Sequence, residues 1–161
     1  MSARLWGIIV AVAVVIADQL AKAAAIRGLD GVEVSVGPIL NLTLARNKGI
    51  SFSMFADAPS GRWVLLAFTL VASVAIFVWL LRARTLLSAV AIGLILGGAL
   101  GNGCDRLLSG SVTDFLDLHL GAWHLFVFNL ADAAISLGVA GLLWESLVDR
   151  RTAAPADKTA S

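Results

Sequence analysis

The sequence has few charged residues, a single cysteine and only two histidines. Charged residues make up 14% of its 161 residues, against roughly 25% in an ordinary soluble domain. The formal net charge of +1 argues against nucleic acid as a partner. The single cysteine, Cys104, excludes an internal disulfide, and so few cysteines and histidines argue against a structural zinc site.

Long apolar runs, by contrast, dominate the chain. Hydrophobic residues make up 59% of the sequence and the mean hydropathy is +0.90, which indicates an integral membrane protein. Four runs can cross a bilayer as helices at about 1.5 Å per residue, over about residues 5–26, 63–81, 85–104 and 125–146. Five tryptophans lie at or near the ends of these runs, where indole rings prefer the headgroup region. They are Trp6, Trp63, Trp79, Trp123 and Trp144.

We expect a single four-helix membrane domain over residues 1–150 and a disordered cytoplasmic tail over residues 151–161. An even number of spans places both termini on one side of the membrane. Positive residues divide six to five between the two sides, but those beside the termini crowd the membrane edge, which favours cytoplasmic termini. The first run continues to about residue 26 without a convincing cleavage site, so we interpret it as a retained anchor.

The outer connection, residues 27–62, predicts a small β-sheet. Apolar and polar residues alternate over residues 32–36, Gly37 and Pro38 interrupt them, and the alternation resumes over residues 39–45. The predicted fold class is therefore an α-helical integral membrane protein with four transmembrane helices and a small β-sheet in the outer, periplasmic connection.

The third run carries a stripe of glycines. Gly93, Gly97 and Gly101 follow one another at intervals of four, with Gly98 and Gly103 beside them. Such small residues let helices approach closely, so we expect the stripe to pack helices within one bundle or between two copies.

Three of the four runs carry polar residues near the same membrane face. These residues are Asp18 and Lys22 in the first run, Asn102 and Asp105 in the third, and Asn129 and Asp132 in the fourth. The run boundaries place Asp132 roughly 10 Å and Asp18 roughly 12 Å from the outer ends of their helices. Because a carboxylate inside a membrane is costly, each of these residues needs a partner or a function.

Several of these residues also have a structural interpretation. Asp18 and Lys22 are spaced i,i+4 and can neutralise one another. Asp105 and Arg106 can mark an ordinary helix end, and Asn129 can bond a neighbouring helix.

Two aspartates remain as candidates for acid–base chemistry. Asp132 has no cation within one helical turn in the sequence, and it shares a helical face with Asn129. Asp114, in the second outer connection, is a loop aspartate when taken alone. Paired with Asp132, it becomes an acid–base candidate.

Five motifs spanning about residues 18–135 resemble, in this order, the motif series of bacterial lipoprotein signal peptidase, also called signal peptidase II. The match is specific because all five occur in sequence, with the apolar runs between them. The motifs are Asp18-Gln19-Leu20-Ala21-Lys22, Asn47-Lys48-Gly49-Ile50-Ser51-Phe52, Gly97-Gly98-Ala99-Leu100-Gly101-Asn102-Gly103-Cys104-Asp105-Arg106, Val112-Thr113-Asp114-Phe115 and Phe128-Asn129-Leu130-Ala131-Asp132.

The resemblance implies an intramembrane aspartic endopeptidase of the bacterial inner membrane, with its active site near the periplasmic face. It implies cleavage of prolipoproteins just before a diacylglyceryl-modified cysteine, without metal or cofactor, and inhibition by globomycin-type compounds. We expect a monomer in contact with membrane lipid. Asp114 and Asp132 correspond to the catalytic pair. The supporting positions are Asp18, Lys22, Asn47, Gly98, Asn102, Arg106, Asn129 and Ala131.

Three other functions compete with this prediction. A serine–lysine peptidase would use Ser51 or Ser53 with Lys22 or Lys48. A metallopeptidase would need more ligands than the two histidines, His119 and His124. Outside enzymology, a small transporter or proton-conducting helical bundle also places Asp and Lys inside a membrane, although the sequence has no internal repeat.

Overall fold

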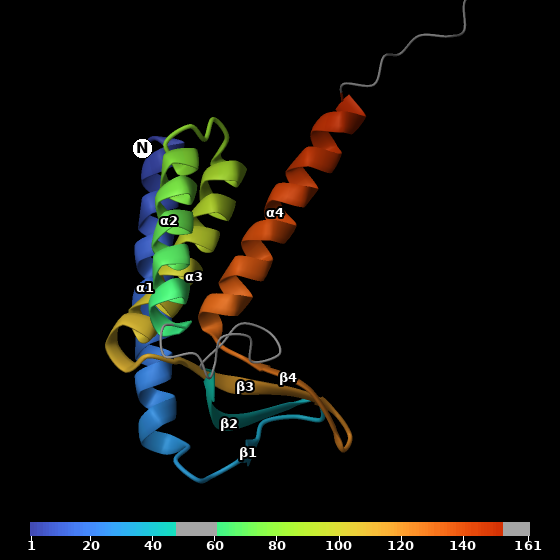
Figure 1. The fold of residues 1–161 in the computed structure, drawn as a ribbon. Coiled ribbons are helices and arrows are strands. Elements are labelled where there is room, and N and C mark those ends of the chain that lie inside the picture. Colours follow the sequence, from blue (N-terminus) through green and yellow to red (C-terminus); the bar gives the residue numbers. More distant parts are fainter. Residues whose placement is uncertain (48–60, 153–161) are drawn as a thin grey trace, which may run out of the picture.

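Four long helices form the body of the protein (Figure 1). The structure is a computed structural model that describes residues 1–47 and 61–152. The helices are α1 (Ala3–Gly28), α2 (Gly61–Leu80), α3 (Leu86–Ser109) and α4 (Leu130–Thr152). All four are long and apolar enough to cross a membrane. The predicted four-helix fold class is confirmed.

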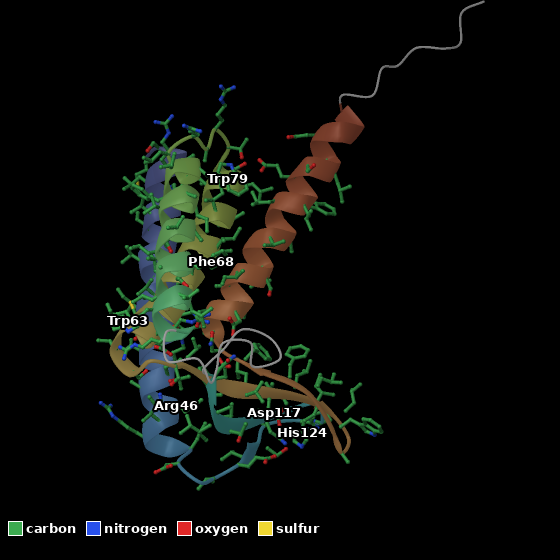
Figure 2. All side chains as sticks on the ribbon, viewed as in Figure 1. Arg46, Trp63, Phe68, Trp79, Asp117 and His124 are labelled. Carbon is green, nitrogen blue, oxygen red and sulfur yellow. The ribbon has the colours of Figure 1, made fainter. Side chains whose placement is uncertain are left out.

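The helix α3 is the centre of the bundle. Half of its most apolar stretch (50%) is buried within the protein, against 17–22% in the other three helices. The remaining apolar surface of α1, α2 and α4 faces outward, as expected for helices surrounded by lipid. Figure 2 shows Trp63 and Trp79 near opposite ends of α2, the positions that indole rings favour at the two membrane interfaces.

Glycines of α3 bring the other helices to backbone contact. A Cβ atom on Gly93 would lie 2.3 Å from the carbonyl oxygen of Gly7 in α1, and one on Gly98 would lie 2.4 Å from the carbonyl oxygen of Ala131 in α4. Only glycine fits these two positions without movement of the neighbouring backbone. The predicted glycine stripe therefore packs helices of one and the same chain.

A four-stranded antiparallel sheet lies across one end of the bundle, away from the N-terminus (Figure 1). Its strands, in spatial order, are β1 (Val34–Ser35), β2 (Leu40–Asn47), β3 (Val112–Leu120) and β4 (Trp123–Phe128). The predicted sheet contained only the first outer connection. The second outer connection supplies the other half, and Gly121, at a φ of 59°, lies in the turn that joins β3 to β4.

Two helix boundaries differ from those expected. The fourth run was expected to begin near residue 125, but residues 123–128 form β4 and α4 begins at Leu130. A short apolar run rich in aromatic residues fits a strand as well as a helix, so the run alone could not separate them. The third run was expected to end near residue 104, whereas α3 continues through Asp105 and Arg106 to Ser109.

At the opposite end of the bundle, a carboxylate of α4 connects this helix to the start of α3. Glu145 accepts hydrogen bonds from the hydroxyl groups of Thr85 and Ser88. Thr85 is also the N-cap of α3, and its hydroxyl accepts from the backbone N–H of Ser88. A negative charge at the N-terminus of α3 is favourable because the helix dipole is positive there.

Candidate active site

The first turn of α4 is closed by a reciprocal pair of side chains. The Oδ1 atom of Asn129 accepts from the backbone N–H of Asp132 at 3.0 Å, and Oδ2 of Asp132 accepts from the backbone N–H of Asn129 at 3.2 Å. This arrangement is a capping box, which fixes where the helix starts. Asp132 is thus the third residue of α4, and the depth of roughly 10 Å expected from the sequence was wrong, because the helix begins later than expected.

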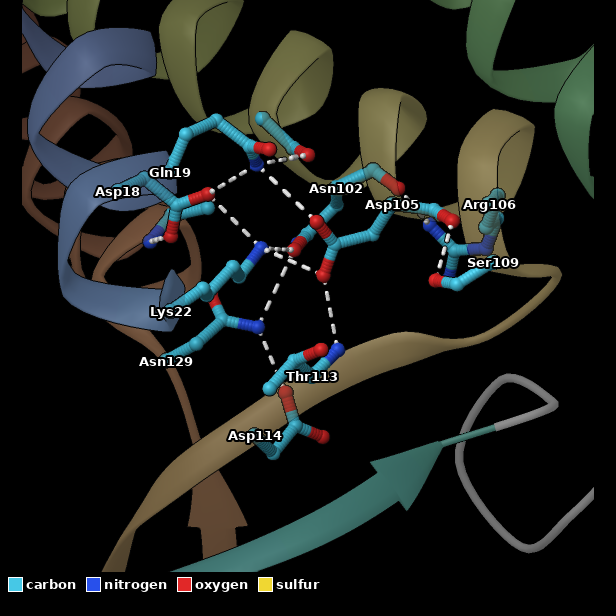
Figure 3. Close-up of polar contacts among 12 residues, drawn as sticks. Asp18, Gln19, Lys22, Asn102, Asp105, Arg106, Ser109, Thr113, Asp114 and Asn129 are labelled. Carbon is cyan, nitrogen blue, oxygen red and sulfur yellow. Dashed lines mark hydrogen bonds and ion pairs between the residues drawn. The ribbon is translucent and has the colours of Figure 1, made fainter. Parts of the chain in front are cut away.

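Two amide side chains connect Asp132 with Asp114 of β3. Asn102 in α3 donates from Nδ2 to Oδ1 of Asp132 at 2.8 Å. Asn129 donates from Nδ2 to Oδ1 of Asp114 at 2.6 Å and to Oδ1 of Asn102 at 3.1 Å. Figure 3 shows Asn129 between Asp114 and Asn102. The two aspartates that the sequence singled out therefore share one hydrogen-bonded network, although they come from a strand and a helix.

Asp114 lies in the sheet, outside the membrane-spanning helices, and is 3% exposed. Burial raises the pKa of Asp114 to about 6. The hydrogen bond that Asn47 donates from Nδ2 to Oδ2 of Asp114, at 3.2 Å, opposes this rise in pKa, and the negative charge of Asp132 adds to it. Asp114 therefore keeps its proton at pH values where an ordinary aspartate is ionised.

A buried lysine, Lys22, connects residues of α1 and α3 next to the two aspartates. The Nζ atom of Lys22 lies 2.8 Å from Oδ2 of Asp18 and 3.2 Å from Oδ2 of Asp105, and it donates to Oδ1 of Asn102 at 3.0 Å. Asp18 also accepts from the backbone N–H of Ala131 at 3.0 Å, which ties α1 to the start of α4. The i,i+4 pairing expected for Asp18 and Lys22 within α1 is present. Lys22 also contacts Asp105 and Asn102 of α3.

Replacing Lys22 with methionine is expected to lower the free energy of unfolding by about 3–5 kcal/mol, because two buried carboxylates would lose their cation. Thermal or denaturant unfolding in detergent measures the change. The control is Arg27→Met at the exposed last turn of α1, with an expected loss of about 0.5 kcal/mol or less. A Lys22→Met, Asp105→Asn double variant is expected to recover part of the loss. Equal losses in Lys22→Met and Arg27→Met would contradict this account.

Two residues of this network had no predicted role at the site. Gln19 donates from Nε2 to Oδ1 of Asp105 at 3.0 Å and to Oδ2 of Asp18 at 3.3 Å. Asp105 also accepts from the backbone N–H of Thr113 at 2.8 Å, next to Asp114. Figure 3 shows Asp105 pointing toward β3. The signal in the sequence was the membership of both residues in the quoted motifs, and their reach across helices could not be read from it.

The other predicted positions lie around the same network. Ala131 is fully buried beside Gly98, and Arg106 donates to the carbonyl oxygen of Asn102 at 3.5 Å. The charge of Arg106 is close enough to Asp114 and Asp132 to interact with both electrostatically. All the predicted site positions thus lie around one network at the junction of α1, α3, β2, β3 and α4.

Of the residues named for the competing peptidase mechanisms, Lys22 belongs to the network above, where it is paired with carboxylates. Ser51, Ser53 and Lys48 lie outside the described residues. His119 and His124 oppose one another in the β3–β4 hairpin, where Nδ1 of His124 lies 2.5 Å from Oδ2 of Asp117 (Figure 2). Across residues 1–47 and 61–152, no three His, Cys, Asp or Glu side chains are arranged to hold a metal ion.

The fold and the site together define a multi-pass membrane protein with a buried network of carboxylates and amides beneath an external sheet. The family model for signal peptidase (SPase) II matches residues 10–148. The chain belongs to the signal peptidase II family. The resemblance that the five motifs predicted is confirmed.

Named relatives and solved structures agree with this assignment. The chain is 42% identical to the lipoprotein signal peptidase of Beijerinckia indica subsp. indica, over 97% of this chain and 96% of that protein. It is 45% identical to the lipoprotein signal peptidase of Paraburkholderia phymatum, over 86% of this chain and 85% of that protein. It also matches a bacterial membrane enzyme structure determined in meso at 2.3 Å, with a TM-score of 0.77 and 30% identity, over 96% of this chain and 94% of that one.

The family assignment settles the class of activity. The chain is a protease of the bacterial membrane that acts on signal peptides, and its four apolar helices make it a multi-pass inner membrane protein. The peptidase prediction is thereby supported over the transporter or proton-conducting alternative.

Proposed function

We propose that this protein removes signal peptides from prolipoproteins by an aspartic mechanism, in which Asp114 and Asp132 are the catalytic pair and cleavage falls just before a diacylglyceryl-modified cysteine. The observation that carries the proposal is the pair of amides, Asn129 and Asn102, that donate to one carboxylate each. The relatives named lipoprotein signal peptidase support the substrate class.

Hydrolysis of an amide by two carboxylates needs one base and one acid. The base takes a proton from water as the water attacks the scissile carbonyl carbon, and the acid protonates the leaving nitrogen. Two neighbouring carboxylates that share one proton supply both groups. The raised pKa of Asp114 supports this division, because one member of the pair keeps its proton up to about pH 6, where an ordinary aspartate is already ionised. The titration belongs to the pair, so acid and base are not assigned to single residues.

The surrounding residues have positioning roles in this proposal. Asn102 and Asn129 fix the two carboxylates, and Lys22 is the cation shared by Asp18 and Asp105. These two aspartates in turn hold the start of α4 and the start of β3. Arg106 supplies positive charge beside the pair, where it can polarise a carbonyl group of the substrate.

The location of the site suits a lipid-modified substrate. We place both termini in the cytoplasm and the sheet in the periplasm, so that acyl chains stay in lipid while the peptide bond reaches the carboxylates under the sheet. We also propose that globomycin-type inhibitors occupy this site and that the chain acts as a monomer. The glycine contacts of α3 with α1 and α4 of the same chain support the monomer.

The test compares two forms of one precursor protein, with and without diacylglyceryl on the lipobox cysteine, incubated with the purified protein in lipid. We expect cleavage just before the modified cysteine, inhibition by globomycin, and no effect of a metal chelator. The unmodified precursor is expected to remain intact. Equal cleavage of both precursors would refute the substrate assignment. Solute flux in vesicles without any cleavage would favour the transporter alternative.

A further inference from the structure

The two faces of the β3–β4 hairpin differ in polarity. Side chains alternate along a strand, so residues at even spacing from Asp114 share its face of the sheet. On that face the cross-strand pairs are all apolar, and we call it the apolar face. The pairs are Leu116 with Phe128, Leu118 with Phe126, and Leu120 with Trp123. A register shift between Leu118 and His119 gives β4 one extra residue, so Trp123 lies on this face although its spacing from Phe126 is odd.

The opposite face carries the polar groups of the hairpin. Asp117 is 2% exposed, and its Oδ2 atom contacts Nδ1 of His124 at 2.5 Å. His119 lies opposite His124, and its Nδ1 atom lies 3.1 Å from the carbonyl oxygen of Gly121. The hairpin is therefore amphipathic: polar pairs occur only on this face, although Val127 also lies on it, opposite Asp117.

The apolar face is bare toward the tip of the hairpin. Leu120 is 58% exposed, Trp123 79% and Phe126 56%. The rings of Phe126 and Phe128 lie 5.5 Å apart, which continues the apolar surface back toward Asp114. Clusters of large exposed apolar side chains mark interaction surfaces, because burying them is favourable.

The position of the hairpin indicates what covers this surface. The apolar face is the face that Asp114 shares, and Asp114 is bonded to Asn129 at the start of α4, so this face is turned toward the membrane-spanning helices. Figure 1 shows the tip of the β3–β4 hairpin projecting sideways beyond the helices, on the side toward which α4 leans. The medium beside membrane helices is lipid, and α4 presents exposed Leu137 and Leu143 to it.

We propose that the apolar face of the β3–β4 hairpin, centred on Leu120, Trp123 and Phe126, is a docking surface for the lipid leaflet next to the sheet. Trp123 would lie at the headgroup level, with its ring in lipid and its N–H near water. On the opposite face the exposed side chain of His124 would remain toward water, whereas Asp117 and His119 are buried within the protein. Because the same strand carries Asp114, this contact would set the height of that carboxylate relative to the membrane.

The test is fluorescence quenching of Trp123 in a chain whose other four tryptophans are replaced by phenylalanine, reconstituted in phosphatidylcholine vesicles. We expect lipid with brominated acyl chains to reduce the emission of Trp123 by about half or more, and iodide in the water to have little effect. The control carries Trp123→Phe and Ser35→Trp in the same background. Ser35 is an exposed residue of β1 that pairs with Asn41, the neighbour of Asp117 on the polar face. This control is expected to respond to iodide and not to brominated lipid.

The outcomes separate lipid from other occupants of the surface. Quenching of Trp123 by iodide but not by brominated lipid would overturn the proposal. Protection that appears only after a precursor is added would assign the surface to substrate, and protection that disappears on dilution of protein in lipid would assign it to a second copy. If the fourfold replacement does not fold, the wild type and its Trp123→Phe variant are compared, and the wild type is expected to show the larger bromine-dependent loss. The readout is independent of catalysis, so it stands whether or not the proposed reaction is correct.

Discussion

Replacing Asp132 with asparagine is expected to reduce cleavage of the lipid-modified precursor by about a thousandfold or more, because the pair loses the proton transfer on which the proposed chemistry depends. The substitution keeps the shape of the side chain and one acceptor oxygen, so Asn129 can still cap α4 in part. Initial rates of cleavage in lipid measure the loss. Unfolding in detergent is expected to show a much smaller effect than the rate.

Asp114→Asn is expected to cause a similar loss, and the double variant should be little worse than either single variant, because the two groups act as a unit. The matched control is Asp117→Asn. Asp117 is an equally buried aspartate of β3, three residues from Asp114 and on the opposite face of the sheet. It should retain a rate within about threefold of the wild type, as expected for a residue outside the reacting groups. Near-normal cleavage in either Asp114→Asn or Asp132→Asn would eliminate the aspartic pair.

The pH dependence follows from the same pair. Burial raises the pKa of Asp114 to about 6. Below this pH the pair carries its shared proton, and the proton is lost as the pH rises through 6. The rate constant kcat/KM is therefore expected to fall above about pH 6. Asn47 lowers the pKa of Asp114 through its hydrogen bond, so Asn47→Ala should raise that pKa and move the fall to higher pH. A shift to lower pH would contradict this assignment.

The four helices and the family could be predicted because each depends on a strong local signal. Apolar length alone identifies a membrane span, and a motif series identifies a family by order and content. The ion pair between Asp18 and Lys22 was also predictable, since residues spaced i,i+4 on a helix are neighbours. These features need no knowledge of how the helices pack.

The features that were missed depend on contacts between distant segments. The apolar residues of β4 fit the start of a helix when taken alone, and only the pairing with β3 identifies them as a strand. The helix α4 begins at Leu130, so Asp132 lies in its first turn and not in the interior, where the sequence placed it. Its hydrogen bonds with Asn129 are therefore those of a capping box. The partnership of Gln19 with Asp105, 86 residues apart, likewise has no local signal.

Replacing Gly98 with alanine is expected to reduce cleavage by about a hundredfold, because displacing catalytic groups by about 1 Å can have an effect of this size. A Cβ atom at this position would lie 2.4 Å from the carbonyl oxygen of Ala131 and 2.6 Å from Cγ1 of Ile135. The backbone of α4 must move away from α3 to make room. That movement would stretch the 2.8 Å hydrogen bond between Asn102 and Asp132, which joins the same two helices.

Gly138→Ala provides a matched control on the same pair of helices. A Cβ atom on Gly138 would lie 2.5 Å from the carbonyl oxygen of Ala91 and 2.6 Å from Cγ1 of Ile95, so it separates α3 and α4 by a similar clash, but about 9 Å further along α4 from Asp132. Both variants are expected to lose similar stability in unfolding experiments, whereas only Gly98→Ala should lose most of its cleavage rate. Equal losses of rate would mean that the glycine at position 98 serves helix packing in general. A selective loss in Gly98→Ala would mean that close contact between α3 and α4 at this level is what holds Asp132 in place.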